Sequence, residues 1–286
     1  MRPEVQAALE NALGQRVKSA SPMRGGDVSD AFDVRLAGGD RAFVKTRADL
    51  PALAFEREAE GLLWLAEASA VRIPRVLAFS KTEPGFLALE HIEAAAPSTA
   101  AEERLGRELA ALHRFGAPRF GLSTSNFLAT LPQENGERAD WASFYRMRRL
   151  DPLLERARAR GLVSRGLSSR FERLYERLPD LVGPAEAPAR LHGDLWGGNW
   201  LADRAGVPYL IDPAVYAGHR EIDLAMMRLF GGFGRRVFAA YEEAYPLSPG
   251  ASERVELYQL YPLLAHAVMF GSGYIGQIES ALSAYV

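Results

Sequence analysis

Two aspartates and an asparagine are spaced in this sequence in a way that suits phosphoryl transfer. Asp194 lies in the string LHGDLWGGNW, and Asn199 follows it after four intervening residues. An apolar run at residues 209–211 then leads directly into Asp212. The first carboxylate would accept a proton from a hydroxyl, while the amide and the second carboxylate offer oxygen ligands that suit magnesium. Phosphoryl transfer needs little more from side chains, because positioning and charge stabilisation do most of the work.

Protein kinases write the same loop as H-R-D-x-x-x-x-N. Here His192, Asp194 and Asn199 keep the spacing, and Gly193 replaces the arginine. The competing interpretation is that these polar residues only cap turns in a glycine-rich loop, but their joint spacing favours chemistry. Isolated histidines more often lie in a hydrogen-bonded core than bind metal. His192 is therefore expected to brace the loop, and His113, His219 and His266 are expected to be structural.

A lysine on a predicted strand is the candidate cation of the site. Lys45 ends the apolar run AFVK, where an unpaired charge would be costly to bury. Glu58 follows on a predicted helix, and the two would form the lysine–glutamate ion pair that orients nucleotide phosphates. Glu56 is a rival partner that lies about 200° around the helix, so only one of the two can face Lys45. The alternative is a surface lysine whose stem covers apolar neighbours.

Two further segments each allow a functional and a purely structural interpretation. The turn around Gly25, Gly26 and Ser29 would cover phosphates with backbone amides and a hydroxyl, or it is a plain hairpin turn. It lacks the G-x-G-x-x-G pattern, and two aspartates nearby have the wrong charge for phosphate. Trp196 lies inside the Asp194–Asn199 loop, where it either packs or forms a platform for substrate. We favour substrate contact for Trp196.

Composition indicates a globular protein of 286 residues, with 48% hydrophobic and 24% charged residues. A net charge of −2 provides no general attraction to nucleic acid or to anionic membranes. The chain has no cysteine, which suits a reducing cytoplasm and excludes disulfides and cysteine-based zinc sites. We expect no signal peptide and no membrane span. The arginine-rich residues 146–160 are interpreted as a solvated helix face rather than a polyanion site.

The order of predicted elements indicates an α+β fold with two lobes. Strands are expected at residues 17–23, 31–36 and 41–46, followed by a helix over 53–68 and further extended chain to Ile92. Beyond a small-residue connector at residues 94–98 the chain reads as mainly helical. We therefore predict a small lobe over residues 1–92, with an antiparallel sheet and one helix, and a larger helical lobe over residues 93–286. The cleft between the lobes is the expected ligand site.

At this level of detail the chain resembles a known family, the fructosamine (ketosamine) kinases. These belong to the protein-kinase-like superfamily, together with aminoglycoside and choline kinases. The HGD-x4-N loop alone indicates the superfamily, whereas LWGGN and the segment GH-x-E-x-(D/E)-L-A point to the ketosamine branch. The resemblance spans nearly the whole chain and also includes the strings GGDVSDAF, FVK, FEREAEGL, LEHI, LGRELAALH and FGSGY.

The resemblance implies ATP-dependent phosphorylation of the 3-hydroxyl of a sugar attached to an amine, which repairs glycated amines. It implies that Lys45 binds the α- and β-phosphates of ATP and that Glu58 holds Lys45 in place. Asp194 would be the base, and Asn199 and Asp212 would bind Mg²⁺. The strand end Glu90, His91 and Ile92 would be the adenine hinge, and Trp196 would border the sugar pocket.

Departures from the protein-kinase pattern predict a constitutively competent metabolic kinase. Asp212 is followed by Pro213 and Ala214 instead of Phe-Gly, and Gly193 removes the arginine that pairs with a phosphorylated loop in many regulated kinases. The alternatives are a kinase of another small hydroxyl compound, such as an aminoglycoside or an amino alcohol, and a nucleotide-binding scaffold without activity. The sugar, the amine carrier and the oligomeric state are not readable from the sequence.

Overall fold

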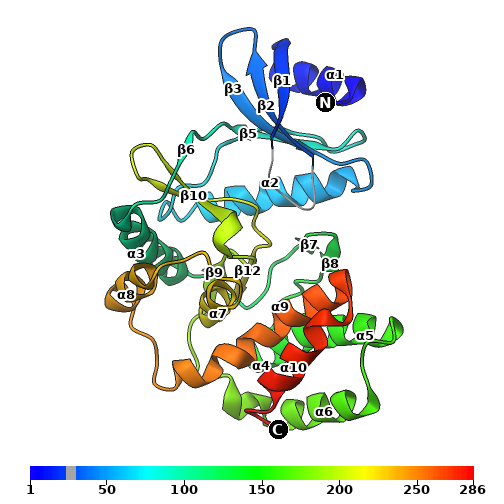
Figure 1. Cartoon of the computed structure of the whole chain (residues 1–286), viewed down its shortest axis with the longest axis vertical. Helices are drawn as coiled ribbons and strands as arrows, with labels where there is room; N and C mark the ends of the chain where they lie inside the picture. The colour runs from blue at the N-terminus through cyan, green and yellow to red at the C-terminus, as the bar shows by residue number, and fades with distance from the viewer. Residues whose placement is uncertain (24–29) are drawn as a thin grey trace.

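The computed structural model describes residues 1–23 and 30–286. An antiparallel sheet dominates the upper lobe in Figure 1, with the strand order β1-β2-β3-β5-β4. Helices α1 and α2 pack with this sheet, and the prediction of one helix in this lobe missed α1. The elements are α1 (Pro3–Leu13), β1 (Val17–Met23), β2 (Asp30–Leu36), β3 (Arg41–Thr46), α2 (Ala52–Ala66), β4 (Val76–Phe79) and β5 (Phe86–Glu90).

Alternating side chains explain how the sheet is covered. In β3, Ala42 and Val44 are buried beside Val5 and Leu9 of α1, which lie four residues apart on one helix face. Helix α2 buries Phe55 and other apolar residues in a second cluster that continues into the lower lobe. One helix therefore covers each face of the sheet, and α2 lies next to the cleft.

The lobes are joined just after β5. The next strand, β6 (Ala94–Ala95), pairs with β10 (Trp200–Asp203) of the lower lobe, which in turn pairs with β11 (Pro208–Leu210). The division that we predict between residues 92 and 93 lies one residue before β6, and it stays a proposal.

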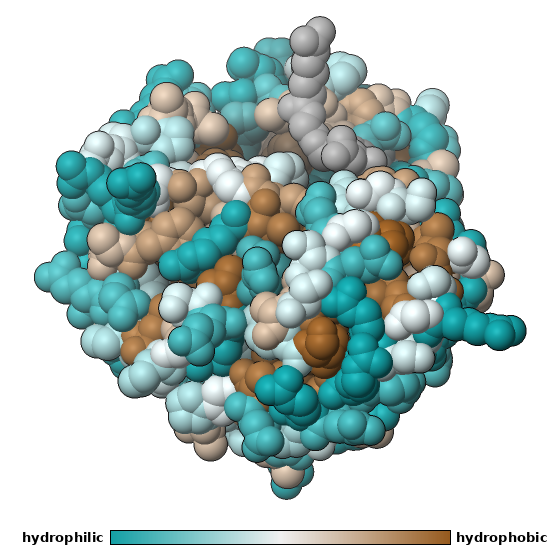
Figure 2. Space-filling model, turned by 60° about the horizontal axis from the view of Figure 1, so that its bottom comes forward, coloured by the Kyte–Doolittle hydropathy of each residue, from teal (hydrophilic) through white to brown (hydrophobic). Residues whose placement is uncertain are grey.

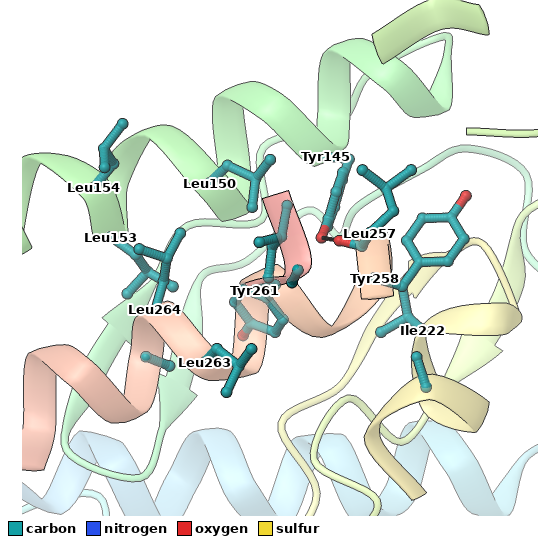
Figure 3. Packing of buried hydrophobic residues seen from close by; sticks show 14 of the residues in the cluster. Tyr145, Leu150, Leu153, Leu154, Ile222, Leu257, Tyr258, Tyr261, Leu263 and Leu264 are labelled. Atoms are coloured by element: carbon teal, nitrogen blue, oxygen red, sulfur yellow. Dashed lines mark hydrogen bonds between the residues drawn. The ribbon is translucent and has the colours of Figure 1, made fainter. Parts of the chain in front are cut away.

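The lower lobe is mainly helical (Figure 1). Helices α3 and α8 lie side by side, and α9 runs through the centre of the largest apolar cluster. In Figure 3, Leu150 and Leu153 face side chains of α9, and the Tyr145 hydroxyl donates to the carbonyl oxygen of Leu257 at 2.6 Å. The α-helices of this lobe are α3 (Thr99–Phe115), α4 (Trp141–Phe144), α5 (Asp151–Ala159), α6 (Arg165–Leu181), α7 (Glu221–Phe230), α8 (Arg235–Ala244), α9 (Val255–Phe270) and α10 (Ile275–Leu282).

Short elements complete the lobe and carry the loops of the cleft. The paired strands β9 and β12 bracket the segment that contains the predicted catalytic residues, and side chains of the hairpin β7–β8 donate hydrogen bonds to it. These elements are β7 (Asn126–Leu128), β8 (Leu131–Gln133), the π-helix η1 (Tyr145–Leu150), β9 (Ala189–Leu191), β12 (Tyr216–Gly218) and the 3-10 turns η2 (Gly197–Asn199), η3 (Ala251–Arg254) and η4 (Ser272–Tyr274).

The arginine-rich run is only partly the solvated face that we predicted. Arg146 and Arg148 pair near the surface with Asp151 and Glu134. Arg149, however, is 1% exposed. It belongs to the π-helix η1, whose wider turn departs from the 3.6-residue period on which the prediction rested.

The face drawn in Figure 2 carries hydrophilic residues with small hydrophobic patches scattered among them. Among the described residues, no helix combines the length and the apolar character required to cross a bilayer.

Candidate active site

A cleft of about 910 Å³ contains the predicted chemical residues. Lys45 and Glu58 come from the upper lobe, whereas Asp194, Asn199 and Asp212 come from the lower lobe, and all five line the cleft. The structure therefore places these five predicted residues in one cleft. A volume of this size suits a nucleotide and a small acceptor.

Lys45 lies at the centre of the contact between the lobes. It is 7% exposed on β3, and its Nζ donates to Glu58 Oε1 at 2.8 Å and to Asp212 Oδ1. Burial lowers the pKa of Lys45, but the carboxylates of Asp212 and Glu58 outweigh this effect and raise the pKa above its usual value. Lys45 therefore remains charged. Glu56 lies 3.8 Å from Lys81 instead, so Glu58 is the partner on α2.

The loop before Asp194 is held through its backbone by Asp223 of α7. The two carboxylate oxygens of Asp223 accept from the amides of His192 at 2.8 Å and of Gly193 at 2.9 Å. Asp223 is fully buried, and His113 lies 3.2 Å from the same carboxylate. The sequence reasoning assigned no role to Asp223, although it lies in the GH-x-E-x-(D/E)-L-A segment.

Gly193 is required by its backbone conformation. Its φ of +81° lies in the left-handed region, and a Cβ at this position would lie 2.1 Å from the carbonyl oxygen of Ala214. The glycine in place of the kinase arginine is therefore a packing requirement of this loop.

His192 braces the loop, as predicted. Its Nε2 contacts the carbonyl oxygen of Ile211 at 2.8 Å, and its Nδ1 accepts from the Asp194 amide at 3.3 Å. These partners require a proton on Nε2 and none on Nδ1. Burial lowers the pKa of His192, against the opposing effect of Asp223, so the neutral form is favoured. His113 and His219 are also buried, whereas His266 is half-buried and lines the cleft.

Asp194 lies deep in the cleft, with solvent reaching part of its side chain. Asn199 donates from Nδ2 to the Asp194 carbonyl oxygen at 2.8 Å and to Asp194 Oδ2 at 3.1 Å. Burial raises the pKa of Asp194 to about 7; the charge of Asp212 adds to this shift and the Asn199 amide opposes it. A carboxylate with such a pKa is a better base than an ordinary aspartate.

The donor set of Asn199 and Asp212 fits a magnesium ion. The amide nitrogen of Asn199 is committed to Asp194, and the amide oxygen accepts no hydrogen bond from the described residues. Oδ1 of Asp212 contacts Lys45, whereas Oδ2 accepts no hydrogen bond from the same part of the chain. Magnesium commonly uses one or two protein oxygens together with phosphate and water. Asp212 has a φ of +57°, a strained conformation that clusters at functional sites.

An aromatic wall from the lower lobe lines the cleft. His266 lies 4.4 Å from the ring of Phe230, 5.4 Å from Phe270 and 5.2 Å from Tyr274, measured between ring centroids. Trp196 also lines the cleft and is 40% exposed. The exposed part of this side chain is available to a ligand in the cleft, and the substrate role of Trp196 stays a prediction.

The structure does not test the predicted roles of the glycine-rich turn and of the adenine hinge. Gly25, Gly26 and Ser29 lie outside the described residues. Glu90 accepts hydrogen bonds from Arg75, and His91 contacts Arg41 at 3.1 Å. Neither these two residues nor Ile92 is among the residues that line the described cleft. The adenine-hinge role of all three therefore stays a prediction.

The two lobes, the strand lysine and the loop that carries Asp194 and Asn199 define a kinase-like phosphotransferase. The solved complex of gentamicin with APH(2″)-IIa has the same fold, with a TM-score of 0.68 at 18% identity, and the match covers 99% of this chain and 95% of that one. A Thermobifida fusca protein assigned as a fructosamine-3-kinase is more similar. Its structure matches with a TM-score of 0.91 at 37% identity, over 99% of both chains.

The chain belongs to the fructosamine kinase family, whose model matches residues 1–286. A Thermus thermophilus protein assigned as a ketoamine kinase is 43% identical over 97% of this chain and 98% of its own. The protein-ribulosamine 3-kinase of rice chloroplasts is 32% identical over 99% of this chain and 83% of its own. The predicted family, bilobal fold and enzyme class, a ketosamine kinase, are confirmed.

Proposed function

We propose that this protein transfers the γ-phosphoryl group of ATP to the 3-hydroxyl of ketosamines, with Mg²⁺ as the metal. The observation that carries the proposal is the meeting of Lys45, Asp194, Asn199 and Asp212 in one cleft of a fructosamine kinase family member. The use of ATP is supported by a structural neighbour, aminoglycoside phosphotransferase APH(2″)-Ib, which was solved with ADP.

The upper half of the cleft is suited to hold the nucleotide. Lys45 would bind the α- and β-phosphates, and Glu58 keeps the ammonium group of Lys45 pointing into the cleft. Asn199 and Asp212 would hold the metal through their free oxygens. When bound, Mg²⁺ supplies positive charge that neutralises the phosphate oxygens. Lys45 would give up its contact with Asp212 to bind phosphate.

The lower half of the cleft is suited to hold and activate the acceptor. Asp194 would take the proton of the 3-hydroxyl as the phosphoryl group arrives, and Asn199 orients its carboxylate. A pKa of about 7 lets Asp194 be ionised and still accept a proton near neutral pH. Trp196 would pack against the sugar, as aromatic rings commonly do with apolar ligand faces.

The charges of the cleft favour ketosamines over polycationic acceptors. The described carboxylates that line it are Glu58, Asp194 and Asp212, and each has a role in phosphoryl transfer. None remains to bind the several ammonium groups of an aminoglycoside. The wall of Phe230, Phe270 and Tyr274 presents uncharged rings instead.

The product is expected to release its sugar, so the physiological role would be deglycation. The rice relative is named for a protein substrate, which supports testing adducts on proteins as well as on free amino acids. A cytoplasmic location is supported by the absence of cysteine and by the many bacterial relatives.

A coupled assay of ADP release tests the proposal. The acceptors are fructosyl-, ribulosyl- and erythrulosyl-lysine, with an aminoglycoside and choline as comparisons, each with and without Mg²⁺. We expect magnesium-dependent turnover of at least one ketosamine at a kcat/KM about 100-fold above the two comparison compounds. Turnover of the aminoglycoside or choline alone would overturn the substrate assignment.

A further inference from the structure

A buried arginine lies behind the cleft without a carboxylate partner. Arg149 of η1 has no acidic side chain within ion-pair distance in the described part of the chain. Its guanidinium lies 3.7 Å from the ring centre of Tyr216 and 4.7 Å from that of Phe144. It donates to the carbonyl oxygens of Glu134 and Arg148, both at 2.8 Å. Such a costly buried cation requires an explanation beyond packing.

The explanation begins with a chain of amides from the β7–β8 hairpin. Arg149 Nη2 donates to Asn135 Oδ1 at 2.7 Å, and Asn135 Nδ2 donates to Asn126 Oδ1 at 2.8 Å. Gln133 Nε2 also donates to Asn126 Oδ1, at 2.9 Å. A guanidinium can only donate, so it forces the Asn135 oxygen toward itself and the Asn135 nitrogen toward Asn126. The cation thus sets the direction of the Asn135 amide, which in turn presents its nitrogen to the oxygen of Asn126.

The amide chain ends on the backbone just after Asp212. Asn126 Nδ2 donates to the carbonyl oxygen of Val215 at 2.8 Å, and Gln133 Nε2 donates to that of Ala214 at 3.1 Å. These carbonyls lie two and three residues after Asp212. The ring of Tyr216, the next residue, packs on Arg149 itself.

The same segment is also held from its other side. The Ala214 amide donates to the His192 carbonyl oxygen at 2.9 Å. On α2, Gly61 lies three residues after Glu58, and a Cβ at Gly61 would lie 3.0 Å from Val215 Cγ2. The backbone that follows Asp212 is therefore enclosed between the buried amides, the catalytic loop and the helix that carries Glu58.

We infer that Arg149 is a positioning residue for phosphoryl transfer, because it orients Asn135 and so supports the amides of Asn126 and Gln133, which hold residues 214–216 and thereby Asp212 in place. This inference rests on the proposed function, in which Asp212 binds the metal. Regulated kinases order the corresponding segment by phosphorylation. Here a permanent buried cation would hold residues 214–216 through its amides, in line with the predicted lack of a phosphorylation switch.

Three substitutions separate this role from simple packing. Arg149→Met removes the donor, and Arg149→Lys restores a cation. Asn135→Asp keeps the side-chain size and gives Arg149 a carboxylate, but it places an acceptor against Asn126 Oδ1 and so reverses the polarity of the chain. Arg146→Met is the matched control, because Arg146 lies on the same π-helix near the surface and pairs with Asp151.

Two measurements read the position of Asp212 without requiring turnover. The first is amide hydrogen exchange of residues 212–217. The second is nucleotide affinity by calorimetry in Mg²⁺ and in EDTA. For Arg149→Met and Asn135→Asp we expect exchange at least about tenfold faster in that segment, a smaller gain of affinity from Mg²⁺, and unchanged affinity in EDTA. With a ketosamine acceptor, kcat should fall about tenfold while the acceptor KM stays within about twofold. Arg149→Lys should recover part of each effect, and Arg146→Met should show none.

Unchanged exchange and an unchanged gain from Mg²⁺ in a folded Asn135→Asp protein would overturn the inference. If Arg149→Met does not fold, Asn135→Asp decides the question by the same readouts. If the wild-type protein phosphorylates no ketosamine, the proposed function fails, and the exchange data still decide whether Arg149 positions residues 212–217.

Discussion

Lys45 and Asp212 are 167 residues apart in the sequence, and their side chains are in direct contact across the cleft. The same ammonium contacts Glu58, so a single cation joins β3, α2 and the segment that follows β11. Burying one cation between two carboxylates leaves a net negative charge beside it. That arrangement suits a site that is completed by magnesium and a nucleotide.

Replacement of Lys45 should therefore impair the use of ATP. For Lys45→Met we expect kcat/KM for ATP to fall about 100-fold, the scale of losing one preorganised charge at a reacting group. Lys81→Met is the matched control, because Lys81 is 72% exposed and lies 3.8 Å from Glu56. Steady-state kinetics with varied ATP measures both. Equal loss in the two variants would show that Lys45 has no special role.

Glu56 and Glu58 of α2 should differ in the same way. Glu58→Gln removes the charged partner of Lys45, and we expect about a tenfold loss in kcat/KM for ATP, as for a lost hydrogen bond to a charged group. Glu56→Gln should change this value by less than about twofold. If Glu56→Gln were the more damaging substitution, the helix would face the cleft differently from the structure described.

The sequence could predict which residues meet in the cleft because these residues carry local signals. The spacing of Asp194, Asn199 and Asp212 reflects one loop and one hairpin, and Lys45 stood out as a charge on an apolar strand. The choice between Glu56 and Glu58 could not be made, since it depends on how far α2 is rotated against the sheet.

Residues whose role depends on distant partners were missed. The spacing of Arg149 is that of a solvated face, and only the packing of η1 against Tyr216 buries it. Asp223 lay within a quoted string, but its contacts with the amides of His192 and Gly193 depend on where α7 docks. Helix α1 did leave a signal, because Val5 and Leu9 are spaced for one buried face.

Trp196 should affect the acceptor and not the nucleotide. Its side chain is exposed enough that Trp196→Ala should fold normally. We expect the KM for the ketosamine to rise about tenfold, from the loss of one aromatic contact, while the KM for ATP stays within about twofold. Varying each substrate at saturation of the other measures the two effects. A change confined to the KM for ATP would contradict a substrate role for this residue.

Stability should fall in mild acid because of a buried histidine. Burial lowers the pKa of His219 to about 4, against the opposing effect of Glu186, whereas a histidine in the unfolded chain has a pKa of about 6.5. Between these values the unfolded state binds more protons, so the stabilisation is fully present above about pH 6.5 and is lost as the pH falls. One such group lowers the free energy of unfolding by about 1 kcal/mol per pH unit.

Urea unfolding between pH 7 and pH 5 measures this dependence. His219→Gln should be less stable than the wild type at pH 7, and its stability should fall less steeply toward pH 5. His192, whose pKa is also lowered by burial, should leave part of the slope in place. Parallel curves for the two proteins would show that His219 is already charged in the folded state.

The central claim is that Asp194 is the base in phosphoryl transfer to a ketosamine, and Asp194→Asn tests it most directly. The measurement is kcat for ADP release with fructosyl-lysine at saturating MgATP, together with the affinity for MgATP by calorimetry. We predict that kcat falls by about 100-fold or more while the nucleotide affinity stays within about threefold of wild type. A variant that turns over at the wild-type rate would contradict the assignment of Asp194 and the mechanism built on it.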